Sequence, residues 1–166
     1  IRNHYVGRTF IEPSQNIRNF GVKLKHNANR AEIVGRRVVL VDDSIVRGTT
    51  SQKIVQMVRE AGATEVHMRI ASPPTANPCY YGIDTPNREE LLAANMDVAA
   101  MAKETGVDSL AFISINGLYQ AVGGANRDNE QPQYCDACFT NDYPVPLVDR
   151  VEGRAPAQLS LLAEYR

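Results

Sequence analysis

The chain has 166 residues, 43% of them hydrophobic, which is enough for one domain with its own core. Its 18 Lys and Arg residues are balanced by 19 Asp and Glu residues, so the charge of the chain does not indicate a nucleic-acid or anionic membrane partner. The sequence has no apolar run long enough for a membrane span, and residues 1–10 lack the apolar stretch of a signal peptide. We therefore expect a soluble, cytoplasmic protein with no nucleic-acid or membrane partner.

The first predicted feature along the chain is a flexible lid loop at residues 1–37. These residues are rich in Asn and Arg, contain the breakers Pro13 and Gly21, and show no sustained periodicity. The apolar run at 38–41, Val-Val-Leu-Val, is typical of a strand buried on both faces of a parallel sheet.

Helices and strands then alternate. Periodicity, glycines and prolines predict a helix at 51–61, a strand at 65–72, helices at 87–95 and 97–105, a strand at 110–114 and a helix at 116–122. Strand, helix and strand in succession form a right-handed βαβ unit. The predicted fold class is α/β, with a parallel sheet that carries flanking helices on both faces.

The character of the chain changes at Gly123. From there Gly, Asn, Pro and Tyr are frequent, and a short helix is predicted only at 156–165. We expect an α/β part at 1–122 and an irregular tail at 123–166. Because such a tail buries few apolar residues, it needs an anchor.

Two acids directly follow the first predicted strand. Asp42 and Asp43 are expected at the carboxyl edge of the sheet, where open α/β sheets bind ligands. Adjacent carboxylates stay ionised where cations or hydroxyl donors face them. The next residues supply backbone N–H groups, hydroxyls, a cation and a glycine at a helix N-terminus, which together form an anion site. They are Ser44, Ile45, Val46, Arg47, Gly48, Thr49 and Thr50.

Acids for a sugar diol or Mg²⁺, placed beside a phosphate-binding loop, predict a site for a ribose 5-phosphate. The loop has neither the G-x-x-x-x-G-K pattern of a Walker A motif nor the G-x-G-x-x-G dinucleotide pattern. The alternative is a simple polar turn in which an Asp caps the helix and Gly48 is a turn residue.

Residues 40–50, Leu-Val-Asp-Asp-Ser-Ile-Val-Arg-Gly-Thr-Thr, resemble the phosphoribosyl pyrophosphate (PRPP) signature of type I phosphoribosyltransferases. The flanking sequence resembles one family of that class, the glutamine phosphoribosylpyrophosphate amidotransferases. Residues 5–11 and 25–30 are similar to the family's loop that closes over PRPP, and Tyr-Gly-Ile-Asp at 81–84 is similar to a further family segment. The resemblance extends roughly over residues 1–145.

The resemblance implies a glycosyltransferase that displaces pyrophosphate from C1 of PRPP with ammonia from glutamine. The product is 5-phosphoribosylamine, in the first committed step of purine synthesis. It implies that Asp42 and Asp43 hold the ribose hydroxyls and Mg²⁺ and that residues 44–50 hold the 5-phosphate. The lid residues expected to close over the pyrophosphate are Tyr5, Arg8, Thr9, Lys25 and Arg30. For each of these cations the alternative is a solvated loop charge.

The cysteines form a second candidate site. Cys135 and Cys138 have C-x-x-C spacing and could supply two ligands to a metal, and Cys79, after a stiff proline-rich segment, is a third candidate. The resemblance implies a [4Fe-4S] cluster on these three, with its fourth ligand outside this chain, that anchors the tail. The alternatives are a buried Cys79 with two surface thiols, or a zinc site completed by one of three histidines: His4, His26 or His67.

The resemblance also implies parts that these residues do not contain, above all an N-terminal glutaminase domain. We therefore expect the chain to be the C-terminal part of a longer enzyme and a poor catalyst alone, with the phosphoribosyltransferase part at 1–122. A homotetramer and feedback inhibition by purine nucleotides are also implied. Two other hypotheses remain: another type I phosphoribosyltransferase, such as a base-salvage enzyme, and a non-catalytic module that senses PRPP or nucleotides.

Overall fold

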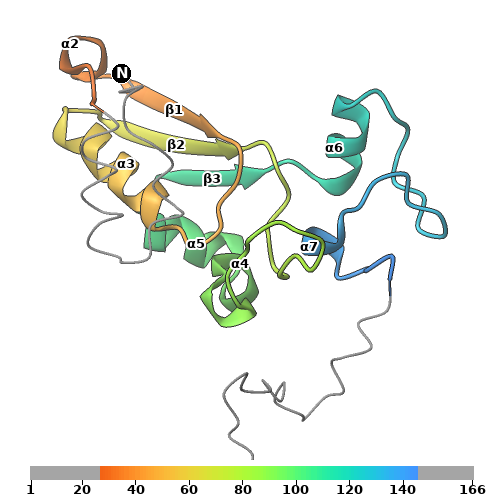
Figure 1. Ribbon diagram of the computed structural model, residues 1–166. Coiled ribbons are helices and arrows are strands. Elements are labelled where there is room, and N and C mark those ends of the chain that lie inside the picture. Colours follow the sequence, from red (N-terminus) through yellow and green to blue (C-terminus); the bar gives the residue numbers. More distant parts are fainter. Residues whose placement is uncertain (1–26, 146–166) are drawn as a thin grey trace, which may run out of the picture.

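The computed structural model describes residues 27–145. Within them one sheet of three parallel strands has the order β1-β2-β3 (Figure 1). The strands are β1 Arg37–Asp42, β2 Glu65–Ile70 and β3 Ser109–Phe112. The last residue of β1, Asp42, pairs with Ile70 of β2, so both strands end at the same edge.

Helices connect the strands as the alternating pattern predicts. α3 (Thr49–Glu60) joins β1 to β2, and α5 (Val98–Thr105) precedes β3. The Asp97 carboxylate caps α5 by accepting a hydrogen bond from the Ala100 N–H at 2.8 Å. The other helical segments are α2 (Arg30–Ile33), η2 (Arg88–Glu90), α4 (Leu92–Asn95), α6 (Ile115–Ala121) and α7 (Ala137–Thr140).

Most of the predicted elements are confirmed, with ends that differ by a few residues. The helix predicted at 87–95 is instead two short segments, η2 and α4, separated at Leu91, whose backbone is extended. The helix predicted at 156–165 lies outside the described residues. Within residues 27–145, no helix has the length and apolar character needed to cross a bilayer.

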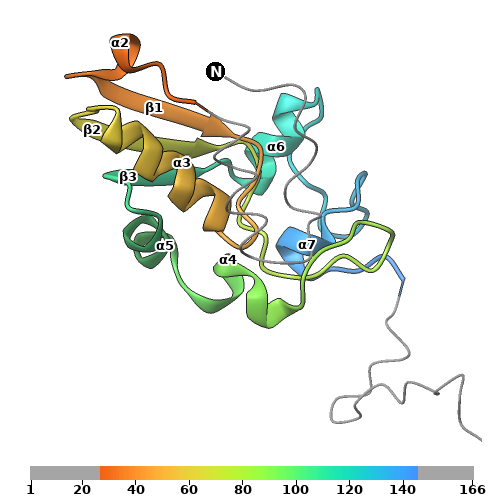
Figure 2. The same cartoon turned by 60° about the vertical axis from the view of Figure 1, so that its left-hand side comes forward.

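The core lies on one face of the sheet, beneath α3 and α5 (Figure 2). Side chains alternate along β2, so that every second residue is buried in this core. The buried cluster comprises Ile45, Val55, Val58, Val66, Met68, Ile70, Leu92, Met101 and Val107. Each such aliphatic side chain contributes roughly 1.5–3 kcal/mol when it is fully buried.

The opposite face of the sheet is open within residues 27–145. Val39 and Val41 of β1 are 59% and 75% exposed. The expectation that this strand is buried on both faces, with helices on both, is therefore wrong for the described residues, because α3 and α5 pack into a single core on the other side. A parallel α/β sheet with flanking helices is confirmed.

Part of this open face carries a polar network. The Arg37 Nε donates to Glu65 Oε2 at 2.8 Å, and the two ring nitrogens of His67 contact Glu65 Oε2 and Ser109 Oγ at 2.8 and 2.9 Å. The hydrogen bond with His67 lowers the pKa of the Glu65 carboxyl, and Arg37 adds to this effect. His67 thus makes hydrogen bonds within its sheet, which disfavours it as a zinc ligand.

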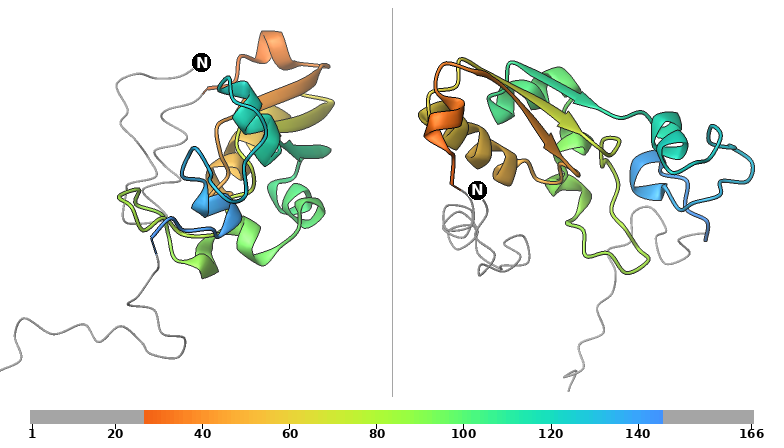
Figure 3. Two further views of the ribbon diagram at one scale, coloured as in Figure 1. Left: turned by 90° about the vertical axis from the view of Figure 1, so that its right-hand side faces the viewer. Right: turned by 90° about the horizontal axis from the view of Figure 1, so that it is seen from above.

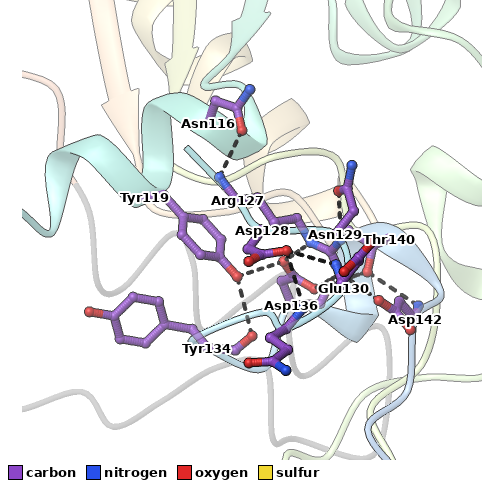
Figure 4. Close-up of polar contacts among 11 residues, drawn as sticks. Asn116, Tyr119, Arg127, Asp128, Asn129, Glu130, Tyr134, Asp136, Thr140 and Asp142 are labelled. Atoms are coloured by element: carbon purple, nitrogen blue, oxygen red, sulfur yellow. Dashed lines mark hydrogen bonds and ion pairs between the residues drawn. The ribbon is translucent and has the colours of Figure 1, made fainter. Parts of the chain in front are cut away.

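The polypeptide after β3 extends beyond the carboxyl ends of the strands, where α6 and α7 lie (Figure 3). An ion-pair network connects these two helices (Figure 4). Arg127 donates from Nε to Asp136 Oδ2 and from Nη2 to Asp142 Oδ2, both at 2.6 Å. The Tyr119 hydroxyl of α6 donates to the same Asp136 oxygen at 3.0 Å. Direct protein contacts therefore anchor residues 127–142.

Burial alone would raise the pKa of the Asp136 carboxyl, but hydrogen bonds from Arg127, Thr140 and Tyr119 outweigh burial and lower it. Burial raises the pKa of the Tyr119 phenol, and its hydrogen bond to Asp136 raises it further. Asp136 is 4% exposed and is thus held as a buried carboxylate with its charge compensated by Arg127.

Candidate functional site

The acid pair lies where β1 ends. The side chain of Asp42 is partly buried and that of Asp43 is exposed. The Asp43 N–H donates to Asp42 Oδ1 at 3.0 Å, and the Ser44 hydroxyl donates to Asp43 Oδ1 at 3.1 Å. The Asp42 carbonyl accepts from the Ala71 N–H at 2.9 Å, which ties the end of β1 to the end of β2. Both acids are thus fixed at the carboxyl edge of the sheet, as the sequence predicts.

A short loop carries the chain from these acids into α3. Ile45 is 1% exposed and anchors the loop in the core. Gly48 has a φ of 77°, a left-handed conformation in which most residues are strained. Glycine has no side chain that could cap the helix, so the first N–H groups of α3 remain available to a ligand. Thr49 and Thr50 begin α3 and add hydroxyls at the same place.

Arg47 makes a contact that the sequence did not predict. Its Nε donates to Glu90 Oε2 of η2 at 2.7 Å, across 43 positions of sequence. The Val46 carbonyl accepts a hydrogen bond from the Leu92 N–H at 2.8 Å. Residues 88–92 therefore lie directly against the loop.

The predicted lid falls mostly outside the described residues. Tyr5, Arg8, Thr9 and Lys25 are not among them. Arg30 is exposed and begins α2, which precedes the amino end of β1, whereas Asp42 is at the carboxyl end of that strand. The structure therefore does not bring Arg30 next to the acid pair, and the lid stays a prediction.

The three cysteines occur on two segments that touch. The Cys138 carbonyl of α7 accepts hydrogen bonds from the N–H groups of Ala76 and Asn77 at 3.1 and 3.0 Å. Burial raises the pKa of the Cys138 thiol, and the charges of Cys79 and Cys135 raise it further. The contacts of the Cys138 carbonyl therefore bring α7 against the segment that leads to Cys79.

Two further observations bear on a metal at these thiols. The Tyr81 N–H donates to Cys79 Sγ at 3.4 Å, the kind of contact that iron–sulfur ligands commonly receive. Cys79 and Cys138 are only partly buried and Cys135 is exposed. In residues 27–145, however, no set of three or more His, Cys, Asp or Glu side chains is arranged to hold a metal ion.

Sequence reasoning missed Glu90 and the network of Arg127, Asp136 and Asp142. Asp136 lies between Cys135 and Cys138, whose C-x-x-C spacing is the more specific local pattern and indicates a metal site. The i, i+4 spacing of Asp136 and Thr140 is a local signal for their contact, in which the Thr140 hydroxyl donates to Asp136 Oδ1 at 3.0 Å. No comparable local signal indicates Glu90, because its partner is remote in sequence.

A parallel α/β sheet with an acid pair at a strand end, followed by a glycine turn into a helix, defines a phosphoribosyltransferase-like protein. Solved structures agree with this class. A glutamine PRPP amidotransferase from Bacillus subtilis, in complex with ADP and GMP, superposes with a TM-score of 0.72 at 55% identity, covering 87% of this chain and 31% of that one.

Curated sequences point to the same enzymes. The chain is 66% identical to an amidophosphoribosyltransferase of Rhizobium etli over 164 residues, covering 98% of this chain and 33% of that protein. Identity to the Bacillus subtilis amidophosphoribosyltransferase is 54%, covering 89% and 31%. No protein-family model matches the chain. The chain is a relative of the amidophosphoribosyltransferases and spans about a quarter to a third of their length.

Proposed function

We propose that this chain is the PRPP-binding portion of an amidophosphoribosyltransferase. The complete enzyme would transfer ammonia from glutamine to C1 of PRPP and release pyrophosphate, the first committed step of purine synthesis. The observation that carries the proposal is the acid pair Asp42 and Asp43 at the end of β1, next to the Gly48 turn that begins α3. Identity of 50–66% to curated amidophosphoribosyltransferases supports it.

The roles of the site residues follow from their chemistry. Asp42 and Asp43 would accept hydrogen bonds from the ribose hydroxyls and offer Mg²⁺ the oxygen ligands it prefers. The N–H groups at the start of α3, with the hydroxyls of Ser44, Thr49 and Thr50, would hold the 5-phosphate. Mg²⁺, when bound, neutralises charge on the departing pyrophosphate.

Water must be kept from C1 while pyrophosphate leaves. The developing oxocarbenium character makes C1 electrophilic, so water there would react in place of ammonia. The carboxylates beside the sugar stabilise that positive charge. We assign closure of the site to the lid residues Tyr5, Arg8, Thr9 and Lys25, whose cations would also contact the pyrophosphate. Arg30 would belong to this lid only if α2 moved towards the carboxyl end of β1, because it lies before the amino end of that strand here.

The cysteines belong to the same proposal. Cys79, Cys135 and Cys138 would hold a [4Fe-4S] cluster together with a fourth ligand from outside the chain, since three soft thiols and an N–H donor to one of them are typical of such sites. The three side chains would have to rearrange, because no three such groups in residues 27–145 are arranged to hold a metal. Because Arg127 and Asp136 already anchor the tail, the cluster would add stability to a formed structure.

Partners and location complete the proposal. A glutaminase portion would supply ammonia, and the assembly would be a homotetramer inhibited by purine nucleotides. The Bacillus subtilis structure in complex with ADP and GMP supports the last point. We propose a cytoplasmic location for this chain, although some plant relatives are named chloroplastic.

The test is calorimetric titration of the full chain with PRPP in the presence of Mg²⁺. We expect one PRPP per chain, weaker binding when a chelator removes Mg²⁺, and binding of ribose 5-phosphate at the same site. No heat with either ligand would overturn the proposal. Within the complete enzyme, transfer of ¹⁵N from the glutamine amide to phosphoribosylamine would separate this function from base salvage and from a non-catalytic sensor.

A further inference from the structure

Residues 88–92, which we call the 88–92 segment, contact the phosphate-binding loop in three ways. Glu90 accepts the Arg47 Nε hydrogen bond at 2.7 Å, and the Leu92 N–H donates to the Val46 carbonyl at 2.8 Å. The Leu92 side chain lies against Gly48, where a Cβ atom would come within 2.8 Å of Leu92 Cδ2. Three consecutive loop residues, 46–48, are thus each contacted by this segment.

The 88–92 segment is itself well fixed. Leu91 is fully buried and Leu92 is 9% exposed. The Asn95 side-chain amide donates to the carbonyls of Glu89 and Leu91 at 2.9 and 2.8 Å, which stabilises the turn from η2 into α4. Residues 88–90 are exposed, but the buried Leu91 and Leu92 and the hydrogen bonds of Asn95 hold the segment in place. It can therefore impose a conformation on the loop that it contacts.

The Arg47 guanidinium would be an obvious ligand for a phosphate, but in this structure it pairs with a carboxylate. Its side chain is 31% exposed and that of Glu90 is 49% exposed, so the pair lies at the surface, beside the proposed 5-phosphate position. An arginine whose charge is already matched by Glu90 attracts an anion less than a free one does.

We propose that Glu90 is a positioning residue of the PRPP site, and that Arg47 contributes to the site by pairing with Glu90 and not by contacting the ligand. Their ion pair holds residues 46–48 so that the backbone N–H groups at the start of α3 face the 5-phosphate, and the backbone rather than the guanidinium binds it. This inference rests on the proposed function of the site.

The two possible roles of Arg47 give opposite results for Glu90→Gln. If the ion pair positions the loop, the variant loses the charge that holds Arg47, and affinity for ribose 5-phosphate falls, by about fivefold for a pair this exposed. If Arg47 binds phosphate directly, the variant releases a competing carboxylate, and affinity stays the same or rises.

The experiment measures Kd for ribose 5-phosphate and for pyrophosphate, with Mg²⁺, on the full chain and on three variants: E90Q, R47M and the double variant. We expect E90Q and R47M to weaken binding of ribose 5-phosphate to a similar extent. The double variant should bind no more weakly than either, because both substitutions remove the same interaction. Pyrophosphate affinity should be unchanged in these variants. A variant that only destabilised the fold would instead lose affinity for both ligands.

A matched control is E65Q, which removes the partner of Arg37 in an ion pair of similar length, 2.8 Å, on the open face of the sheet. It should leave both affinities unchanged. A large loss in R47M alone, with E90Q unaffected or tighter, would overturn the inference while leaving the PRPP site intact. Failure of the unaltered chain to bind ribose 5-phosphate would instead overturn the proposed function, and this inference with it.

Discussion

Gly48 lies against Leu92, so that the turn from the acid pair into α3 is shaped by a residue 44 positions further along the chain. Two independent constraints meet at Gly48. Its φ is 77°, and a Cβ atom placed on its backbone would lie only 2.8 Å from Leu92 Cδ2. Glycine satisfies both, because it has no Cβ.

Gly48→Ala should therefore destabilise the chain and weaken ligand binding. We expect a loss of about 2–4 kcal/mol in the free energy of unfolding, from left-handed strain and from overpacking against Leu92. Urea unfolding followed by circular dichroism measures it. Gly35→Ala is the matched control, because Gly35 has a similar φ of 71° but open space around its Cβ position. Equal losses in the two variants would show that the Leu92 contact has no energetic role.

Replacement of the acid pair should separate binding from folding. Asp42→Asn together with Asp43→Asn removes two charges from a partly or fully exposed strand end. We expect PRPP affinity to fall by at least about 100-fold, since the proposed ligands of Mg²⁺ and of the ribose hydroxyls are lost. The melting temperature should stay within a few degrees of its original value. Calorimetry and thermal unfolding on the same sample measure the affinity and the melting temperature. Retained PRPP affinity would contradict the assignment of the PRPP site to Asp42 and Asp43.

The sequence predicted β1, the acid pair and α3 correctly because all three depend on local patterns. An apolar run followed by two acids, and apolar residues at helical spacing after Gly48, are visible within about twenty residues. Asp97 and Gly106 similarly mark the ends of α5, since one caps its start and the other adopts a φ of 77° at its end.

Other features depend on partners that are remote in sequence. The run at 38–41 is equally apolar whether one or both faces are covered, so it did not predict that Val39 and Val41 are exposed in residues 27–145. Arg47 has many acids within reach of an unfolded chain, and nothing local selects Glu90. The anchor of the tail is also remote from any local pattern. The sequence suggests the cysteines for this role, whereas in the structure Arg127 anchors the tail through its ion pair with Asp136.

Arg127→Met should release part of the tail from α6. Arg127 and Asp136 have side chains that are 9% and 4% exposed, so removal of the cation leaves a buried carboxylate without its charge partner. We expect a loss of roughly 2–4 kcal/mol in stability and faster hydrogen exchange in residues 127–142. Glu32→Gln, which removes an exposed ion pair with Arg36, is the control and should change stability by less than about 0.5 kcal/mol. Unchanged exchange in the Arg127 variant would show that other contacts anchor the tail.

Loss of one thiol should affect iron more than the fold of the tail. Cys138→Ser removes one of the three proposed cluster ligands, so we expect iron content, measured after anaerobic purification, to fall strongly. Because the Arg127–Asp136 ion pair is retained, the melting temperature should fall less than in Arg127→Met. A larger fall in Cys138→Ser would mean that the cluster is the principal anchor.

Asp108 should make stability depend on pH in the acid range. Hydrogen bonds from the Val66 N–H, at 2.7 Å, and from Arg59, at 2.8 Å, lower the pKa of this carboxyl from its ordinary value of 3.8. The unfolded chain therefore binds more protons than the folded chain just below that value. The resulting stability is fully present above about pH 4 and is lost as the pH falls through the lowered pKa of the folded state.

Asp108→Asn tests this dependence, because an amide does not titrate in the acid range. We expect the variant to be less stable at pH 7 and to lose less further stability between about pH 4 and pH 2 than the original chain. Chemical denaturation of both proteins across that range measures the two slopes. If Asp108→Asn keeps the full acid slope, the dependence arises from other carboxylates, of which Asp136 is the next to test because its pKa is also lowered by its hydrogen bonds despite burial.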